Sequence, residues 1–142
     1  MYRPPMAAWL VKQEPSTYSW ERLVAENVAV WDGVRNAQAR NNLAAMKKGE
    51  QVLFYHSGDD KAVVGIAKVA RTAYPDPTSD DPRWLAVDLV PVKKLTNPVS
   101  LARIKAERSL AEMVLVRHSR LSVMPVREDE LKTILALSKS AA

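Results

Sequence analysis

The chain has 142 residues, which suits one domain of ordinary size with a buried core. It contains no cysteine and two histidines, which excludes disulfides, thiolate chemistry and a thiolate zinc site, and we expect neither a metal nor a cofactor. The net charge of +5 favours a polyanionic partner. No segment approaches the roughly 18 apolar residues of a membrane helix, so we expect a cytoplasmic protein with no membrane partner.

The first predicted strand is Ala7–Val11, an apolar run that ends in a polar turn. A helix should follow, because Ser19 is a good N-cap and Asn27 suits the end of a helix. An apolar stripe with i, i+3, i+4 spacing predicts the buried face of this helix, which comprises Trp20, Leu23 and Val24.

Val28–Trp31 is the next predicted strand, because it is rich in β-prone residues. Strand alternation places Ala29 and Trp31 on one face and the two valines on the other. An Asp-Gly turn follows, and Asn36 is the expected N-cap of a helix over Ala37–Met46. The inward residues of that helix should be Ala39, Leu43 and Met46.

The remainder of the chain alternates strands, loops and short helices. The predicted strands are Gln51–Ser57, Ala62–Ala70, Trp84–Val92 and Arg120–Val126. The predicted helices are Ser100–Ala106, Ser109–Leu115 and Glu128–Leu137. Three prolines exclude regular structure from Pro75–Pro82, which should be an exposed loop. Gly65, inside a strand, predicts a close backbone approach or a bend.

These elements indicate the α+β class, with a small curled mixed sheet or barrel and helices packed around it. A parallel doubly wound fold fits poorly, because the middle of the chain has successive strands without a crossover helix. The sequence shows no repeat, low-complexity tract or linker, so we expect residues 8–140 to form a single domain that acts as a monomer. Residues 1–7 should be a disordered extension.

Common catalytic and nucleotide-binding motifs are absent. The sequence lacks GxxxxGK[ST], GxGxxG and GxSxG, and it has only four glycines from which a phosphate loop could be built. His56-Ser57 and His118-Ser119 each place a histidine beside a serine. The two side chains of each pair would point to opposite faces of a strand, and no oxyanion motif accompanies either pair. A serine-hydrolase triad is therefore not expected.

The segment Trp31–Asn36 is the most promising candidate site. Each of its residues has an ordinary structural explanation, Trp31 as a core residue, Asp-Gly as a turn and Asn36 as a helix cap. Together they place an aromatic face and Arg35 beside a helix N-terminus that attracts anions. Holding an extruded nucleic-acid base requires this combination, so we expect the functional site here.

Three other segments carry polar groups, each with two interpretations. Lys12–Trp20 crowds an amine, a carboxylate and hydroxyls where a strand ends, or is a polar turn before a helix. Tyr55–Ser57 lines the same pocket, or is divided between core and solvent. Arg117–Arg120 is a short basic cluster that grips phosphate or forms surface salt bridges.

Several runs of sequence resemble the EVE domain family. The strongest are Trp9–Trp20 (WLVKQEPSTYSW), Trp31–Asn41 (WDGVRNAQARN) and Val52–Ser57 (VLFYHS). The likeness continues in the same order through Val64–Ala67, Tyr74–Thr78 and Ser119–Val123. It extends from about Trp9 to Pro125 and leaves only a short N-terminal extension unmatched.

The resemblance implies a PUA-like fold, related to the ASCH and YTH domains. YTH domains hold a methylated adenine of RNA in an aromatic cage, and EVE domains are thought to read modified bases, including modified cytosine in DNA. The resemblance therefore implies a non-catalytic partner of DNA or RNA that flips a modified base into an aromatic-lined pocket.

The same resemblance assigns residues to this site. Trp31 would be a pocket wall and Asn36 would lie near the base edge, and Trp31→Ala should weaken binding by tens of fold without unfolding the protein. The other pocket residues would be Lys12, Glu14, Ser16, Tyr55, His56 and Ser57. The contacts with phosphate or backbone would be Arg35, Arg40, Arg117 and Arg120.

Two alternative functions stay open at this point. Some ASCH relatives resemble amidohydrolases that remove an acyl group from cytidine with a Lys, a Thr and a Glu. Lys12, Thr17 and Glu14 are chemically suitable as base, nucleophile and acid, although their order and spacing do not obviously reproduce that arrangement. The second alternative is a protein-interaction module, in which Trp31 would be buried and inert.

Overall fold

The computed structural model describes residues 8–140, and six strands in this range form one mixed sheet. The strands are β1 (Ala8–Gln13), β2 (Ala29–Trp31), β3 (Gln51–His56), β4 (Ala62–Pro75), β5 (Leu85–Ser100) and β6 (Val123–Val126). Their order is β2-β5-β4-β3-β1-β6, with β1 and β3 parallel and all other neighbours antiparallel. The predicted α+β class with a mixed sheet is confirmed.

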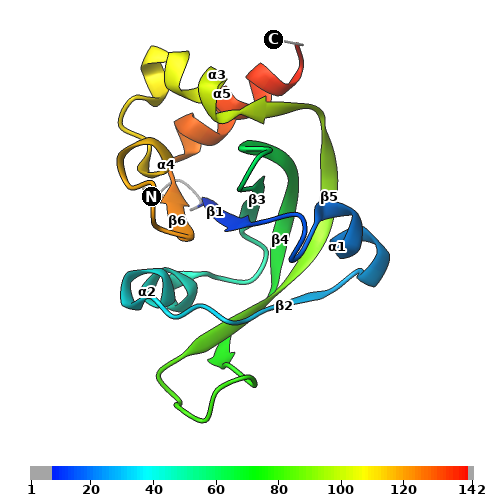
Figure 1. The fold of residues 1–142 in the computed structure, drawn as a ribbon, viewed down its shortest axis with the longest axis vertical. Helices are drawn as coiled ribbons and strands as arrows, with labels where there is room; N and C mark the ends of the chain where they lie inside the picture. Colours follow the sequence, from blue (N-terminus) through cyan, green and yellow to red (C-terminus); the bar gives the residue numbers. More distant parts are fainter. Residues whose placement is uncertain (1–7, 141–142) are drawn as a thin grey trace, which may run out of the picture.

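The helices lie around this sheet (Figure 1). They are α1 (Trp20–Glu26), α2 (Ala37–Ala45), α3 (Leu101–Ala106), the 3-10 helix η1 (Arg108–Leu110), α4 (Val114–Arg117) and α5 (Glu128–Ser138). Figure 1 shows α3 and α5 together at one end of the molecule, and the loop between β4 and β5 at the opposite end. None of the helices within residues 8–140 has the length and apolar character needed to cross a membrane.

The sheet is curled but open. β4 and β5 are 14 and 16 residues long, and their pairing shifts register at four places, which bends both strands. β2 and β6 end the sheet without pairing to one another, so the barrel alternative does not close. Figure 1 shows β5 bending along its length from the end that carries α3 to the loop before β5.

Short sequence signals placed the first two helices correctly. The Ser19 and Asn36 side chains cap α1 and α2 by accepting hydrogen bonds from backbone N–H groups. Asn27 ends α1 in the left-handed conformation. The inward residues of α2 are buried as predicted, and these are Ala39, Leu43 and Met46. Val24 is the exception in α1, because 53% of it is exposed on the side of the helix away from the core.

The predicted helix over Ser109–Leu115 is wrong. The chain instead forms η1, takes an extended backbone at Met113, and then forms α4. Leu110, Met113 and Leu115 are all buried, and their spacing of three and then two residues does not keep one face of a single helix toward the core. The strand predicted from Arg120 begins at Val123, because the preceding residues form a turn.

An aromatic cluster around Phe54 fills the core beside the candidate segment. The Phe54 ring meets the rings of Trp20, Trp31 and His56 edge to face, at centroid distances of 5.7, 5.5 and 5.7 Å. A methyl group added at Gly65 would lie 2.6 Å from the Trp20 ring. The close approach predicted at this glycine is therefore confirmed, and it lets Trp20 lie flat on β4.

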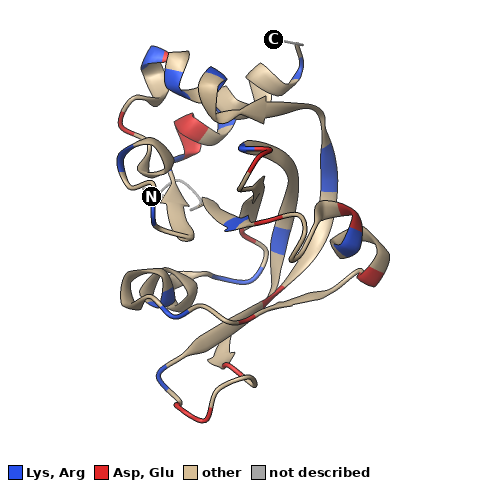
Figure 2. Ribbon diagram, viewed as in Figure 1, with Lys and Arg blue, Asp and Glu red and all other residues tan. Residues whose placement is uncertain are grey.

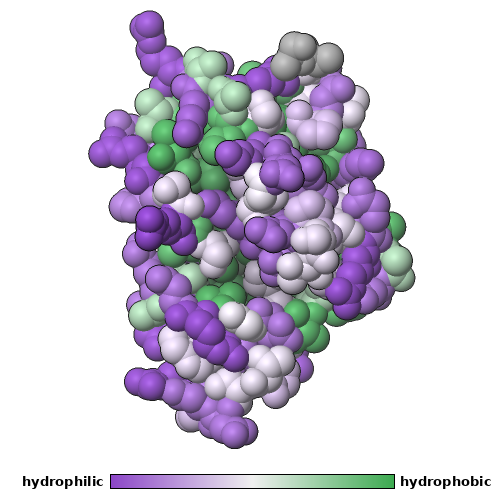
Figure 3. Space-filling view, in the orientation of Figure 1, coloured by the Kyte–Doolittle hydropathy of each residue, from purple (hydrophilic) through white to green (hydrophobic). Residues whose placement is uncertain are grey.

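The expectation of a disordered extension concerns residues 1–7, which are outside the described part of the chain. Among the described residues, lysines and arginines are distributed over many elements and alternate with acidic residues (Figure 2). On the face drawn in Figure 3, hydrophobic atoms lie in several separate areas among hydrophilic ones.

Candidate functional site

A pocket of about 410 Å³ opens between the β1–α1 connection, α1 and β2. Its lining residues are Gln13, Thr17, Tyr18, Arg22, Glu26, Val28, Val30, Trp31 and Asp32. The volume lies within the usual range of small-ligand sites. We call it the Tyr18–Trp31 pocket, because these two residues supply its aromatic surface.

Trp31 is a wall of this pocket and also a member of the core. Only 6% of it is exposed, and its ring packs between Phe54, at 5.5 Å, and Tyr18, at 6.0 Å, in edge-to-face contacts. The strand alternation predicted for β2 is confirmed, because Ala29 and Trp31 are buried while Val28 and Val30 are exposed. The pocket thus has one rigid aromatic wall that the core holds in place.

Two charged residues, Arg22 and Glu26, also line the pocket. The Tyr18 hydroxyl donates to one Glu26 carboxylate oxygen at 2.8 Å, and Arg22 Nε donates to the other at 3.0 Å. Burial, and then the hydrogen bond to Glu26, raise the pKa of Tyr18 to about 12, so the phenol stays protonated. The hydrogen bonds from Tyr18 and Arg22 lower the pKa of Glu26, which therefore stays ionised.

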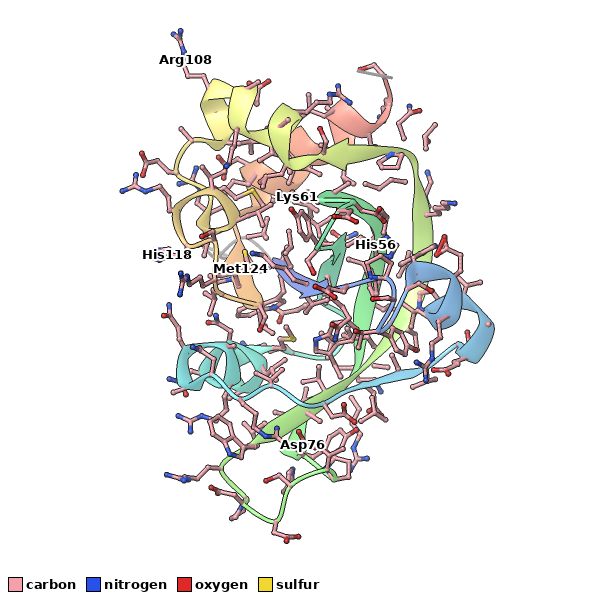
Figure 4. All side chains as sticks on the ribbon, viewed as in Figure 1. His56, Lys61, Asp76, Arg108, His118 and Met124 are labelled. Carbon is pink, nitrogen blue, oxygen red and sulfur yellow. The ribbon has the colours of Figure 1, made fainter. Side chains whose placement is uncertain are left out.

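Asp76 fastens the β4–β5 loop to the turn after β2. Its buried carboxylate accepts hydrogen bonds from the Gly33 backbone nitrogen and from Arg35, both at 2.8 Å. Thr78 donates to the same carboxylate through its backbone nitrogen at 2.7 Å and its hydroxyl at 2.6 Å. Burial alone would raise the pKa of Asp76, but these hydrogen bonds hold it well below its usual range. Figure 4 labels Asp76 beside this loop.

Trp84, at the far end of the same loop, lies close to two cations. The guanidinium groups of Arg35 and Arg40 each lie 5.7 Å from the Trp84 ring centroid. Arg35 is thus engaged by both Asp76 and Trp84, whereas Arg40 also donates to its neighbour Asn41. Two of the four predicted phosphate contacts, Arg35 and Arg40, therefore lie on one surface, formed by the start of α2 and the β4–β5 loop.

Asn36 lies in a second pocket, of about 340 Å³. The residues that line it are Asn36, Gln38, His118, Ser119, Arg120 and Leu121. Lys12 adjoins them, because its ammonium group donates to the Ser119 carbonyl oxygen at 2.7 Å, and burial lowers its pKa. We call this the Arg120 pocket. The structure therefore brings Asn36 and Arg120 together, with Lys12 beside them, but outside the Tyr18–Trp31 pocket.

His56 and Tyr55 are buried at the end of β3. His56 Nε2 accepts a hydrogen bond from the Trp20 backbone nitrogen at 3.0 Å, and its Nδ1 lies 3.2 Å from an Asp60 carboxylate oxygen. The first contact requires an unprotonated Nε2, so His56 serves as an acceptor for the N-terminus of α1. Figure 4 shows His56 among the strands and His118 far from it on the other side of the view.

The remaining predicted site residues lie at the surface. Glu14, Ser16 and Thr17 are exposed in the β1–α1 connection, and of the three Thr17 lines the Tyr18–Trp31 pocket. Ser57 follows β3, and its backbone nitrogen donates to the Gln13 carbonyl oxygen. Arg117 is paired with Glu112 at 2.8 Å.

Sequence reasoning missed four residues of this region, which are Tyr18, Arg22, Glu26 and Asp76. The i, i+4 spacing of Arg22 and Glu26 is a recognisable helix ion pair, but it carries no sign of a pocket. Across residues 8–140, no group of three or more His, Asp or Glu side chains is arranged to hold a metal ion.

Solved structures of high similarity cover nearly the whole chain. A protein from Agrobacterium tumefaciens is 44% identical, with a TM-score of 0.91 over 93% of this chain and 92% of that one. Human THYN1, solved in complex with DNA containing 5-methylcytosine, is 34% identical, with a TM-score of 0.89 over 96% of this chain and 99% of that one. An ASCH protein from Zymomonas mobilis is 12% identical with a TM-score of 0.57, and this likeness concerns the fold alone.

Sequence comparison leads to the same relatives. Human thymocyte nuclear protein 1 is 34% identical over 165 residues, covering 92% of this chain and 73% of that protein. Residues 7–137 match the EVE domain. The mixed sheet, its ASCH-like fold and these matches agree with the sequence resemblance, and the chain belongs to the EVE domain family.

Proposed function

We propose that this EVE domain binds DNA containing 5-methylcytosine, without catalysis, by flipping the modified base into the Tyr18–Trp31 pocket. The observation that carries the proposal is the pocket itself, which is lined by two aromatic residues in contact, Tyr18 and Trp31, and by the Arg22–Glu26 pair, whose charged groups can meet a base edge. The structure of human THYN1 in complex with DNA containing 5-methylcytosine supports methylated DNA as the class of ligand.

Such binding is favourable only when base stacking and phosphate contacts act together. Stacking on an aromatic side chain contributes about 1–3 kcal/mol per base, which is comparable to the cost of unstacking the base. Phosphate contacts must supply the remaining affinity. We assign these mainly to Arg40 and Arg120. Arg117, paired with Glu112, contributes less, and Arg35, held by Asp76, contributes mainly by shaping the turn.

The other predicted pocket residues receive supporting roles in this proposal. Lys12 and Asn36 guide the strand along the Arg120 pocket. Glu14, Ser16 and Ser57 border the β1–α1 connection on the approach to the base. Tyr55 and His56 hold that connection and α1 in position from the core side.

The arrangement of Lys12, Glu14 and Thr17 favours binding over hydrolysis. The Lys12 ammonium group donates a hydrogen bond to the Ser119 carbonyl oxygen, while Thr17 lines the Tyr18–Trp31 pocket, so the candidate base and nucleophile face different surroundings. We therefore expect no release of cytidine when the protein is incubated with an acylated cytidine. The cysteine-free sequence supports a reducing compartment such as the cytoplasm, and a monomer suffices for this site.

The test compares DNA binding before and after removal of the Tyr18 ring. Trp31→Ala is unsuitable, because truncating a tryptophan with 6% exposure leaves a core cavity that costs about 3–5 kcal/mol. Tyr18 is only half-buried, so Tyr18→Leu should keep the fold. We expect Tyr18→Leu to weaken binding to a duplex with one 5-methylcytosine about tenfold or more at fixed salt.

Tyr74→Leu is the matched control, because Tyr74 is also half-buried but lies outside the pocket. Fluorescence anisotropy at one stated salt concentration measures all three proteins, and thermal unfolding shows that each is folded. The pocket assignment is wrong if Tyr18→Leu binds the methylated duplex as tightly as the unchanged protein. It is also wrong if Tyr74→Leu weakens binding as much as Tyr18→Leu does.

A further inference from the structure

Two valines of the Tyr18–Trp31 pocket are exposed although they belong to the sheet region. Val28 and Val30 are 44% and 46% exposed, and both line the pocket. Single exposed valines are ordinary at a protein surface, and Val24 and Val92 are exposed as well, but those two do not line this pocket. Val28 and Val30 give the pocket an aliphatic surface, which is the surface that a methyl group prefers.

Glu26 lines the same pocket as these valines. It is the last residue of α1, two positions before Val28. Tyr18 and Arg22 each donate one hydrogen bond, to different oxygens of the Glu26 carboxylate. Each carboxylate oxygen can accept two hydrogen bonds, so the group retains acceptor capacity toward a ligand.

The chemistry of pyrimidines makes this pairing of surfaces informative. Cytosine, 5-methylcytosine and thymine differ only at C5, which carries hydrogen or methyl, and at C4 with the adjoining N3 proton. The two positions are neighbours on the ring, so the groups that read them must also be neighbours. 5-Methylcytosine and thymine share the methyl group, and the amino group at C4 of cytosine is a donor where thymine has an acceptor.

We propose that these three residues of the pocket determine the identity of the base: Val28 and Val30 contact the 5-methyl group, and the Glu26 carboxylate accepts a hydrogen bond from the neighbouring amino group. The proposal rests on the proposed function, because it names the features of the base that the same pocket reads. The valines separate 5-methylcytosine from cytosine, and Glu26 separates it from thymine.

An ionised carboxylate is well suited to reject thymine. It has no proton to donate to the thymine O4, and bringing two acceptors together leaves both without a partner in a partly desolvated site. The hydrogen bonds from Tyr18 and Arg22 favour the ionised form of Glu26, so the acceptor character persists near neutral pH. A glutamine at this position could instead rotate its amide and donate to O4.

The experiment measures binding of three oligonucleotides that differ at one base. 5-Methylcytosine, cytosine or thymine is placed opposite an abasic site in the same duplex, so that pairing energy does not bias the comparison. We expect the unchanged protein to prefer 5-methylcytosine over cytosine about fourfold, the worth of one buried methyl group, and over thymine about tenfold or more.

Two sets of substitutions separate the two contacts. Glu26→Gln should reduce the preference for 5-methylcytosine over thymine about tenfold while leaving the preference over cytosine in place. Val28→Ala combined with Val30→Ala should abolish the preference over cytosine while thymine is still rejected. Glu21→Gln is the control, because Glu21 is exposed on the same helix but does not line the pocket.

The outcomes distinguish failure of this inference from failure of the proposed function. If the unchanged protein binds all three oligonucleotides equally, the reading of a methylated base is itself wrong. A second outcome concerns Glu26 alone, when the unchanged protein does prefer 5-methylcytosine. Suppose that Glu26→Gln is folded, with a thermal midpoint close to that of Glu21→Gln, and still rejects thymine to the same extent as the unchanged protein. Glu26 then does not read the amino group. If the variant that combines Val28→Ala with Val30→Ala still prefers 5-methylcytosine over cytosine, the valines do not read the methyl group.

Discussion

Asp76 accepts hydrogen bonds from Arg35 and from the Gly33 backbone across 41 and 43 residues of sequence, so one buried carboxylate joins the β4–β5 loop to the turn beside the pocket. Asp76→Asn should lower the free energy of unfolding by about 1–3 kcal/mol, because an amide can satisfy only part of this donor set. Urea unfolding measures the change. Asp81→Asn, in the same loop and paired with the exposed Arg83, is the control and should cost less than about 1 kcal/mol.

The same carboxylate predicts a loss of stability in acid. The pKa of Asp76 lies below its ordinary value in the folded protein, so its contribution is fully present above about pH 4 and is lost as the pH falls toward the folded pKa. The difference in unfolding free energy between the unchanged protein and Asp76→Asn should therefore shrink between pH 6 and pH 2.5. A constant difference over that range would contradict an ionised Asp76.

Substitution of the buried His56 should lower the unfolding free energy, whereas substitution of the exposed His118 should not. His56→Ala removes the acceptor of the Trp20 backbone N–H, and a buried unsatisfied donor costs about 1–3 kcal/mol. His118→Ala alters an exposed residue and should change the unfolding free energy by less than about 0.5 kcal/mol. Equal effects of the two substitutions in urea unfolding would show that the Trp20 contact is unimportant.

Substitution of Gly65 by a larger residue should destabilise the protein through a steric conflict, not through the backbone conformation. A methyl group at this position would lie 2.6 Å from the Trp20 ring, so Gly65→Ala should destabilise the protein by about 1–3 kcal/mol. Trp20→Leu opens the space, at its own cost, and the two substitutions together should destabilise less than the sum of the two alone. Additive effects in thermal unfolding would place the conflict elsewhere.

The two arginines near α4 should differ in their contribution to DNA binding. Arg120 lines a pocket and forms no ion pair with any residue in the described range, whereas Arg117 is already paired with Glu112. Arg120→Ala should therefore reduce the slope of log K against log salt by about one, and Arg117→Ala by clearly less. Anisotropy titrations between about 50 and 200 mM salt measure the slopes. Identical slopes for Arg120→Ala and the unchanged protein would remove Arg120 from the interface.

Local signals in the sequence predicted much of the architecture. The cap at Asn36 and the period of Ala39 and Leu43 placed α2, because both depend on residues within one or two helical turns. Alternation along β2 placed Trp31 inward. Periodicity failed between Ser109 and Leu115, where burial of side chains against other elements decided the backbone.

The candidate site could be predicted only in part. The segment Trp31–Asn36 was found, but the sequence could not show that its two ends lie in different pockets. Two partners of Asp76, Gly33 and Arg35, are more than 40 residues away, and the contact of Tyr18 with Glu26 spans a turn and a helix. Such pairings depend on the tertiary fold, and no local pattern encodes them.

The position of the Asp76 contacts has a practical consequence for protein engineering. The hydrogen bonds that fasten the β4–β5 loop involve Asp76 and Thr78, and the base of the loop is closed where the Asp76 backbone nitrogen donates to the Trp84 carbonyl. Residues Ser79 and Asp80 follow these anchors in the chain, and the hydrogen bonds that Ser79 forms with Asp76 and Asp81 stay within the loop. A fluorescent peptide tag inserted between them should leave the pocket intact, and it would report on DNA binding from the opposite end of the molecule to α3 and α5 (Figure 1).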